Sequence, residues 1–229
     1  MNELILIDCM KFMKTIADDY FDLAIVDPPY GIGDFNAKTR LKKNGQRVSV
    51  NALPVMWNNY KPTEEYFLEL VRVSKKQIIW GANYYNSFNG KNGAIVWHKG
   101  NIQSLFSQCE IASLSFQQKI DYVKIGWQSG FARGAYEKGY DPIHPCQKPI
   151  KLYKWLIKNY AKPNDKLFDS HSGSGSFRIA AHDMGFDLTS CEIDEDYYRD
   201  NEKRFQNHIK QNDLFAPEEL QKEMLQGFL

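Results

Sequence analysis

The stretch KLFDSHSGSGSFRIAAHDMGFDLTSCE, residues 166–192, contains the order of elements that decides the fold. It predicts a strand, a glycine-rich turn, a helix and a second strand that ends at an acid, in the order Lys166–Asp169, 170–176, Phe177–Met184, Asp187–Cys191 and Glu192. This order is typical of a nucleotide site in a Rossmann-like sheet, where the turn and the acid lie at the same sheet edge.

The acids around this turn indicate which nucleotide is bound. Glu192 follows the glycines by about 20 residues, where a carboxylate accepts hydrogen bonds from both ribose hydroxyls. Gly173-x-Gly175 is a weak signal alone, because the full G-x-G-x-x-G is absent and a glycine turn also serves packing. Asp169 precedes the turn, and its charge repels a pyrophosphate and attracts an ammonium group. The sequence therefore favours S-adenosylmethionine over a dinucleotide.

Strands and helices alternate along the rest of the chain. Runs of apolar residues and of residue types that favour strands predict strands at Leu4–Ile7, Phe21–Val26, Gln77–Trp80, Ala94–Trp97 and Cys109–Phe116. Helical spacing predicts helices at Met10–Ala17, at 63–73 with Thr63 as its cap, at Ile150–Tyr160 and from Glu195 to about Lys210. The alternation predicts an α/β doubly wound sheet, mostly parallel, in a single domain spanning 1–229.

Two segments show no clear period. The composition of residues 31–62 predicts a long loop. This loop contains a basic stretch at about 34–50, with Lys38, Arg40, Lys42, Lys43 and Arg47. Such a stretch is either solvated surface or a contact for phosphates. Residues 117–143 also lack a period, and we interpret about 99–143 as a small target-recognition insert.

Composition narrows the classes of protein. The 229 residues are 43% hydrophobic with a formal net charge of +1, so the total charge does not announce a nucleic-acid partner. The four cysteines and five histidines are dispersed, which predicts no disulfide framework and no metal site. No apolar run reaches the roughly 18 residues of a membrane span, and the first residues lack signal-peptide order. We expect a cytoplasmic protein without membrane contact.

The motif Asp27-Pro28-Pro29-Tyr30 directly follows a predicted buried strand, at the sheet edge where α/β proteins bind ligands. The prolines remove two backbone donors and leave carbonyl oxygens beside the Asp27 carboxylate. A pocket with acceptors only is suited to an amino group. Tyr30 offers a flat face for a base rotated out of the duplex. The alternative is a proline-rich turn without chemistry.

At these residues the chain resembles the N4/N6 amino-methyltransferases of DNA, in the circularly permuted arrangement that places D-P-P-Y before the cofactor loop. Two more segments support the resemblance: residues 144–149, HPCQKP, resemble H-P-T-Q-K-P, and Asp8-Cys9 resembles the family's G-D-C strand end. The loop departs from the family, because Ser170 and His171 replace the Pro and Phe of D-P-F-x-G-S-G-T. The resemblance covers nearly the whole chain.

The resemblance implies a Rossmann-like S-adenosylmethionine-dependent fold with helices on both faces of the sheet, and it implies methyl transfer to adenine N6, since cytosine enzymes more often carry S-P-P-Y. The implied catalytic residues are Asp27, Pro28, Pro29 and Tyr30. The predicted cofactor-binding residues are Asp8, Cys9, Asp27, His144, Gln147, Lys148, Asp169, Ser170, His171, Gly173, Gly175, Glu192 and Ile193. The predicted DNA contacts are Lys38, Arg40, Lys42, Lys43, Arg47, Asn83 and Tyr84, with core packing the alternative for the last two.

Several alternatives stay open. Pro145-Cys146-Gln147 resembles the P-C-Q nucleophile of carbon-5 cytosine methyltransferases, but that chemistry leaves D-P-P-Y without a purpose. The substrate is adenine in double-stranded DNA, an RNA adenine, or cytosine N4. The altered loop is also compatible with an inactive DNA-binding relic of the fold. A nicotinamide oxidoreductase is disfavoured because no feature of this sequence supplies hydride chemistry. The sequence leaves open a homodimer and a cognate restriction enzyme.

Overall fold

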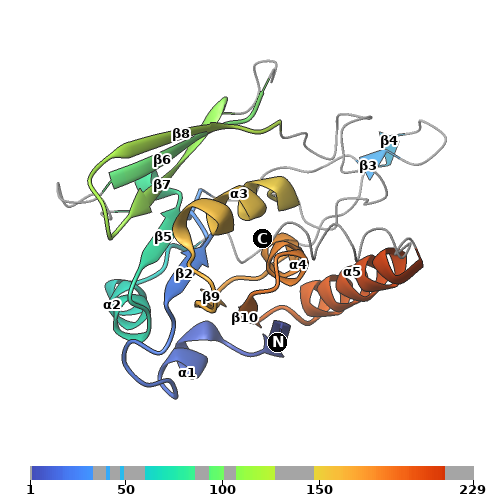
Figure 1. The fold of residues 1–229 in the computed structure, drawn as a ribbon, viewed down its shortest axis with the longest axis horizontal. Coiled ribbons are helices and arrows are strands. Elements are labelled where there is room, and N and C mark those ends of the chain that lie inside the picture. The colour runs from blue at the N-terminus through green and yellow to red at the C-terminus, as the bar shows by residue number, and fades with distance from the viewer. Residues whose placement is uncertain are drawn as a thin grey trace, which may run out of the picture.

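The computed structural model describes residues 2–32, 40–41, 47–48, 60–85, 93–100, 107–126 and 147–214, with backbone alone at 40–41, 47–48 and 212–214. An eight-stranded sheet has the order β1-β10-β9-β2-β5-β7-β6-β8 (Figure 1). Its strands are β1 (Asn2–Leu6), β2 (Leu23–Val26), β5 (Gln77–Trp80), β6 (Gly93–His98), β7 (Cys109–Leu114), β8 (Ile120–Lys124), β9 (Lys166–Asp169) and β10 (Asp187–Glu192).

Strand direction places most of the strand ends at one edge. β1, β10, β9, β2 and β5 pair in parallel. β7 is antiparallel to both β5 and β6, and β8 is parallel to β6. Of the strands in this sheet only β7 runs in the opposite direction, so its first residues lie beside the last residues of β6. The edge that collects the carboxyl ends therefore also receives the start of β7.

Helices cover both faces of the sheet. They are α1 (Cys9–Met13), α2 (Glu64–Val73), α3 (Ile150–Tyr160), α4 (Ser176–Asp183) and α5 (Glu195–Leu214). On β2, Leu23 and Ile25 join one buried cluster with α3, α4 and α5, whereas Ala24 and Val26 join a second cluster with α1 and α2. Alternate residues of a strand point to opposite faces, so the fully apolar β2 is buried on both sides, as parallel strands require.

The doubly wound sheet predicted from the sequence is confirmed, and three details differ. α1 ends at Met13, not Ala17, because Thr15 and Ile16 form tight turns onto Phe12 and Met13. Two antiparallel strands of two residues each, β3 (Arg40–Leu41) and β4 (Arg47–Val48), lie within the predicted loop.

The third difference concerns the predicted insert. Residues 117–143 contain β8, whose exposed Ile120 and Tyr122 alternate with better buried residues as expected of an edge strand. β7 and β8 are strands of the main sheet, so this part of 99–143 is framework. In the part of the chain that the structure describes, no helix is long and apolar enough to cross a membrane.

Candidate functional site

Five neighbouring strands deliver polar or glycine residues to the carboxyl edge of the sheet. These are Asp8 two residues after β1, Glu192 at the end of β10, Asp169 at the end of β9, Asp27 directly after β2 and Gly81 directly after β5. Segments far apart in the sequence meet here because β1 pairs with β10. The order of motifs along the chain and their order in space therefore differ, and the sheet joins them into one site.

Asp27 is held on both carboxylate oxygens. The Tyr30 hydroxyl donates a 2.6 Å hydrogen bond to Oδ1, and the Lys148 ammonium forms an ion pair with Oδ2. The Nζ of Lys148 also lies 3.3 Å from the Tyr30 hydroxyl. Burial, followed by the charges of Asp27 and Glu110, raises the pKa of Tyr30 well above its usual range, so Tyr30 stays a donor. The Asp27 carboxyl group is thus fixed between two donors.

The two proline carbonyls are also engaged. The Tyr85 hydroxyl lies 2.6 Å from the carbonyl oxygen of Pro28 and 2.7 Å from that of Pro29. A single hydroxyl proton is shared between these acceptors, so each keeps acceptor capacity for another donor. Tyr85 directly follows the short turn η2 (Ala82–Tyr84), and the sequence contains no motif that indicates this contact with the proline carbonyls.

Packing fixes the Tyr30 ring. It stacks on Tyr84, with 4.8 Å between ring centroids and 16° between planes. On the β5 side, Gly81 has φ of 74°, and a Cβ built there would lie 2.3 Å from Tyr30 Cε1. Only glycine allows both this backbone conformation and this close approach. The predicted pocket residue Asn83 is exposed, and Tyr84 is half-buried against Tyr30.

Glu192 organises the glycine turn. Its Oε2 accepts a 2.8 Å hydrogen bond from the Gly173 amide, and its Oε1 accepts 3.0 Å bonds from the amides of Ile193 and Asp194. The Ile193 side chain is 64% exposed beside it. Asp8 uses Oδ1 to cap α1 through the amides of Met10 and Lys11. Each carboxylate oxygen has two lone pairs, so both acids keep acceptor capacity beyond these bonds.

Asp169 is a buried carboxyl group, and its ionised form is unfavourable unless a cation lies beside it. The side chain is 3% exposed, and burial, with the charges of Asp27 and Glu192, raises the pKa of Asp169 to about 8. The amide of His171 donates a 3.1 Å bond to it. A positively charged group placed here relieves the cost of the buried carboxylate. The site therefore fits the ammonium of S-adenosylmethionine and disfavours a phosphate.

The altered turn residues form a polar chain inside the protein. Ser170 Oγ lies 2.8 Å from His171 Nδ1 and 2.7 Å from the Tyr66 hydroxyl. Burial lowers the pKa of His171 to about 4, so the ring is neutral at pH 7. Burial, followed by the Asp8 charge, raises the pKa of the Cys9 thiol to about 12. The residues that replace the family's Pro and Phe thus satisfy one another.

Helix α5 supports the turn from behind, which the sequence did not indicate. The Asn201 amide group donates to Ser172 Oγ at 2.9 Å and to the Gly173 carbonyl at 3.1 Å. A Cβ at Gly175, where φ is 74°, would lie 2.3 Å from Asn201 Oδ1. Arg204 donates to the Ser174 carbonyl at 2.7 Å. The second glycine is therefore required by the approach of α5 as well as by its backbone.

Some predicted residues are not located in detail. Lys38, Lys42, Lys43, His144 and Cys146 lie outside the described residues, and Arg40 and Arg47 are described by their backbone in β3 and β4 alone. Gln147 is half-buried and directly precedes Lys148. Lys148, which was predicted to contact the cofactor, pairs with Asp27 and with Glu110, a residue that the sequence did not single out.

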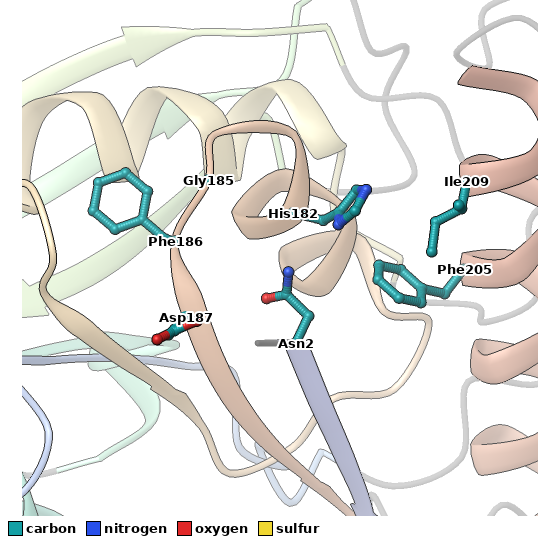
Figure 2. A pocket seen from close by; sticks show the side chains of 7 residues that line it. All are labelled: Asn2, His182, Gly185, Phe186, Asp187, Phe205 and Ile209. Carbon is teal, nitrogen blue, oxygen red and sulfur yellow. The ribbon is translucent and has the colours of Figure 1, made fainter. Parts of the chain in front are cut away.

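Other features of the described residues lie apart from this edge. A hollow of about 310 Å³ is lined by Asn2, His182, Gly185, Phe186, Asp187, Phe205 and Ile209 (Figure 2). Asn2 and Asp187 begin β1 and β10, so this hollow lies at the amino edge, opposite the site. Within the described ranges no group of three or more His, Cys, Asp or Glu side chains is arranged to hold a metal ion.

Comparison with known proteins agrees with the geometry. The family model for N6/N4 methyltransferases, described as DNA methylase, matches residues 42–203. The putative methylase YubD of Escherichia coli strain K12 is 23% identical over 252 residues, covering 95% of this chain and 99% of YubD.

Solved structures share the fold. The complex of M1.HpyAVI with S-adenosylmethionine has a TM-score of 0.57 and 18% identity, covering 89% of this chain and 100% of that one. The cytosine-N4-specific PvuII DNA methyltransferase has a TM-score of 0.58 and 14% identity, covering 88% and 85%. With a family model spanning most of its length, the chain belongs to the N4/N6 DNA methylase family and is a DNA methyltransferase that uses S-adenosylmethionine.

Proposed function

We propose that the protein methylates the exocyclic N6 of adenine in double-stranded DNA, and that Asp27-Pro28-Pro29-Tyr30 binds the target base. The observation that carries the proposal is the set of acceptors after β2: the Asp27 carboxylate and the Pro28 carbonyl, with Tyr85 and Tyr30 supplying the donors that orient them. Acceptors in this arrangement complement an amino group. The choice of adenine rests on Asp as the first residue of the motif, as in the family's adenine enzymes.

In the proposed reaction, Asp27 and the Pro28 carbonyl accept hydrogen bonds from the two amino protons. The amino nitrogen would form a bond to the methyl carbon as the carbon–sulfur bond breaks, the sulfur would keep that electron pair as a neutral thioether, and one amino proton would pass to solvent water. S-adenosylmethionine supplies the methyl group on a positively charged sulfur. No covalent bond to the enzyme forms, so orientation and exclusion of water provide most of the rate gain.

We assign cofactor binding to the neighbouring strand ends. Asp169 meets the ammonium group, Glu192 the ribose hydroxyls and Asp8 the adenine. The proximity of Asp169 and Asp27 supports this assignment, because the charge of Asp27 contributes to the raised pKa of Asp169. Methyl donor and target amino group are thereby brought to adjacent strands, β9 and β2.

DNA contacts are assigned to the basic stretch and to the residues after β5. Lys38, Arg40, Lys42, Lys43 and Arg47 bind phosphates, and Asn83 and Tyr84 lie at the entrance to the base pocket. Neutralising Lys42, Lys43 and Arg47 together should weaken DNA binding and reduce the slope of log affinity against log salt by up to about 2.7, at about 0.9 per phosphate contact. An unchanged slope contradicts the assignment.

Cytosine N4 is the second candidate, because the cytosine-N4-specific PvuII enzyme shares the fold. The deciding experiment transfers labelled methyl from S-adenosylmethionine to unmethylated DNA and to RNA, followed by nucleoside analysis, with Asp27→Ala as the paired variant. Label in N6-methyladenine that Asp27→Ala loses while still binding cofactor supports reaction, base and residue together. Label in N4-methylcytosine or in RNA overturns the substrate, and an active Asp27→Ala overturns the residue.

A folded protein that neither binds cofactor nor transfers label would be an inactive relic. A homodimer and an accompanying restriction enzyme stay predictions, for which light scattering and examination of neighbouring genes are the tests. Target recognition is assigned to the parts of 99–143 outside β7 and β8, most of which lie outside the described residues.

A further inference from the structure

Four charged side chains alternate in sign behind the proposed base pocket. The Lys148 ammonium pairs with Asp27 Oδ2 and lies 3.2 Å from Glu110 Oε2, and Lys99 pairs with Glu110 Oε1. The exposed fractions of the side chains are 4% for Lys148, 6% for Lys99 and 21% for both carboxylates. Buried charges are costly unless they are paired, so these four groups form one unit, the charge chain Asp27–Lys148–Glu110–Lys99.

Separate segments build this charge chain. Lys99 directly follows β6, Glu110 lies near the start of β7, and Lys148 precedes α3. The reversed direction of β7 is what brings Glu110 to the carboxyl edge, opposite Trp97 in the sheet register. The ammonium of Lys148 lies 5.4 Å from the Trp80 ring centroid and that of Lys99 lies 5.5 Å from the Trp97 centroid. Aromatic faces attract cations, so both lysines are held in place.

Glu110 is ionised in this environment. Burial alone would raise the pKa of Glu110, but the charges of Lys148 and Lys99 and their hydrogen bonds outweigh burial and lower it. Two ammonium and two carboxylate side chains give the charge chain a formal charge of zero. Glu110 thus competes with Asp27 for the same ammonium group, and Lys99 limits how strongly Glu110 can compete.

We propose that Glu110 and Lys99 are positioning residues for methyl transfer that act through Lys148. The opposite charges of Glu110 and Lys99 together set how firmly Lys148 holds Asp27 Oδ2. They therefore set how the Asp27 carboxylate faces the target amino group. The proposal rests on the proposed role of Asp27. Neither Glu110 nor Lys99 touches the reacting atoms. A displacement of about 1 Å at a reacting group costs up to about 100-fold in rate, so small changes in this balance should be visible in kcat.

Charge substitution tests the balance. Glu110→Gln leaves the charge chain with one excess positive charge, Lys99→Met leaves one excess negative charge, and the double variant restores zero. In the acidic limb of kcat/KM against pH, an excess positive charge disfavours protonation near Asp27 and an excess negative charge favours it. We expect Glu110→Gln to move the limb to lower pH and Lys99→Met to move it to higher pH.

The double variant should return the limb toward wild type and recover part of the roughly 10- to 100-fold loss in kcat expected of the single variants. The titratable groups facing Asp27 from other segments are Lys148, Glu110, Tyr85, Tyr153 and Asp169, with Tyr30 from its own turn. Apart from Glu110 itself, these groups are unchanged in both single variants. Opposite shifts of the acidic limb in the two variants therefore report the net charge of the charge chain.

Two controls separate positioning from stability. Glu202→Gln breaks the half-buried ion pair with Arg178, between α4 and α5, and should lower Tm without moving the limb. Lys99→Arg keeps the positive charge and should leave the limb at its wild-type pH, whatever its larger side chain does to kcat. Shifts in the same direction for both single variants, or a double variant no better than the worse single one, overturn the proposal. An Asp27→Asn variant with full activity overturns the role of Asp27 instead, so the two failures are distinguishable.

Discussion

The Tyr30 hydroxyl is hydrogen-bonded to Oδ1 of Asp27, so two residues of one four-residue motif satisfy each other at 2.6 Å. With 4.8 Å between ring centroids, the stack of Tyr30 on Tyr84 leaves no room for a base between the two rings. Binding of a flipped base between them therefore requires the rings to separate. The residue proposed to stack on the base is also the one that holds the acceptor before the base arrives.

Substitution of Tyr30 separates these two roles. Tyr30→Phe keeps the ring and removes the hydrogen bond, whereas Tyr30→Ala removes both. Stacking of a base on an aromatic side chain contributes about 1–3 kcal/mol, so Tyr30→Ala should lower kcat/KM on a single-site duplex by about 5- to 150-fold more than Tyr30→Phe. Equal losses in the two variants would exclude a stacking role.

Gly81→Ala tests the support beneath the Tyr30 ring. The added methyl would lie 2.3 Å from Tyr30 Cε1, at a φ of 74°. Gly185→Ala is the matched control, because its φ is 73° and a Cβ there meets nothing within 4 Å. Both variants bear the left-handed backbone cost of about 1–2 kcal/mol, which lowers Tm by about 2–8 °C. Gly81→Ala alone should also lose methyl transfer, and equal activities would contradict this.

The pKa of about 8 at Asp169 predicts pH-dependent cofactor binding. Below this pH the carboxyl is protonated in the free protein, and pairing with the cofactor ammonium requires the ionised form. Binding of S-adenosylhomocysteine at pH 7 should therefore release up to one proton, and affinity should rise as pH approaches 8. Calorimetry in buffers of different ionisation enthalpy measures the released protons. Asp169→Asn should abolish the release, and a release that persists in this variant would assign the proton elsewhere.

The same carboxyl lowers stability at high pH. Its pKa rises from the ordinary 3.8 to about 8 on folding, so between these values the folded protein binds more protons than the unfolded chain. The contribution of the Asp169 carboxyl to the free energy of unfolding is fully present below about pH 4 and is lost as pH rises through 8. Asp169→Asn removes this loss, and its Tm relative to wild type should increase between pH 5 and pH 9. A difference in Tm that is constant across this range would disprove the linkage.

The neutral His171 ring predicts that the departure from the family motif has little effect on cofactor binding. The ring packs edge-on against Tyr66, with 5.5 Å between centroids, and its Nδ1 is satisfied by Ser170. His171→Phe should keep the affinity for S-adenosylhomocysteine within about fivefold, since a lost neutral hydrogen bond costs about 1 kcal/mol. A loss above tenfold would show that the other ring nitrogen binds the cofactor directly.

The sequence predicted the sheet well where patterns are local. β5 and α3 were predicted at their observed bounds, since a run such as Gln77–Trp80 and the helical spacing of 150–160 are complete within the element. β8 was missed because an edge strand of alternating Ile, Asp, Tyr, Val and Lys has no apolar run to identify it. Its pairing with β6 comes from tertiary structure, which single-strand propensity does not encode.

The candidate site was predicted as far as motifs extend. Asp27, Asp169 and Glu192 were found because each ends a strand in a recognisable pattern. Glu110 was not, because it lies inside an ordinary strand, and only the antiparallel direction of β7 places it beside Lys148. Asn201 and Arg204 were hidden for a similar reason, since their partners lie about 30 residues away in the glycine turn.

The pairing of β1 with β10 has a consequence for biosynthesis. The Ser190 hydroxyl donates a hydrogen bond to the carbonyl of Glu3 across 187 positions of sequence, so β1 has no β10 to pair with until about 187 further residues have been translated. At about 5–20 residues per second this wait lasts on the order of 10 to 40 seconds. During that time the β1 edge is unpaired and exposed to chaperones or to other nascent chains.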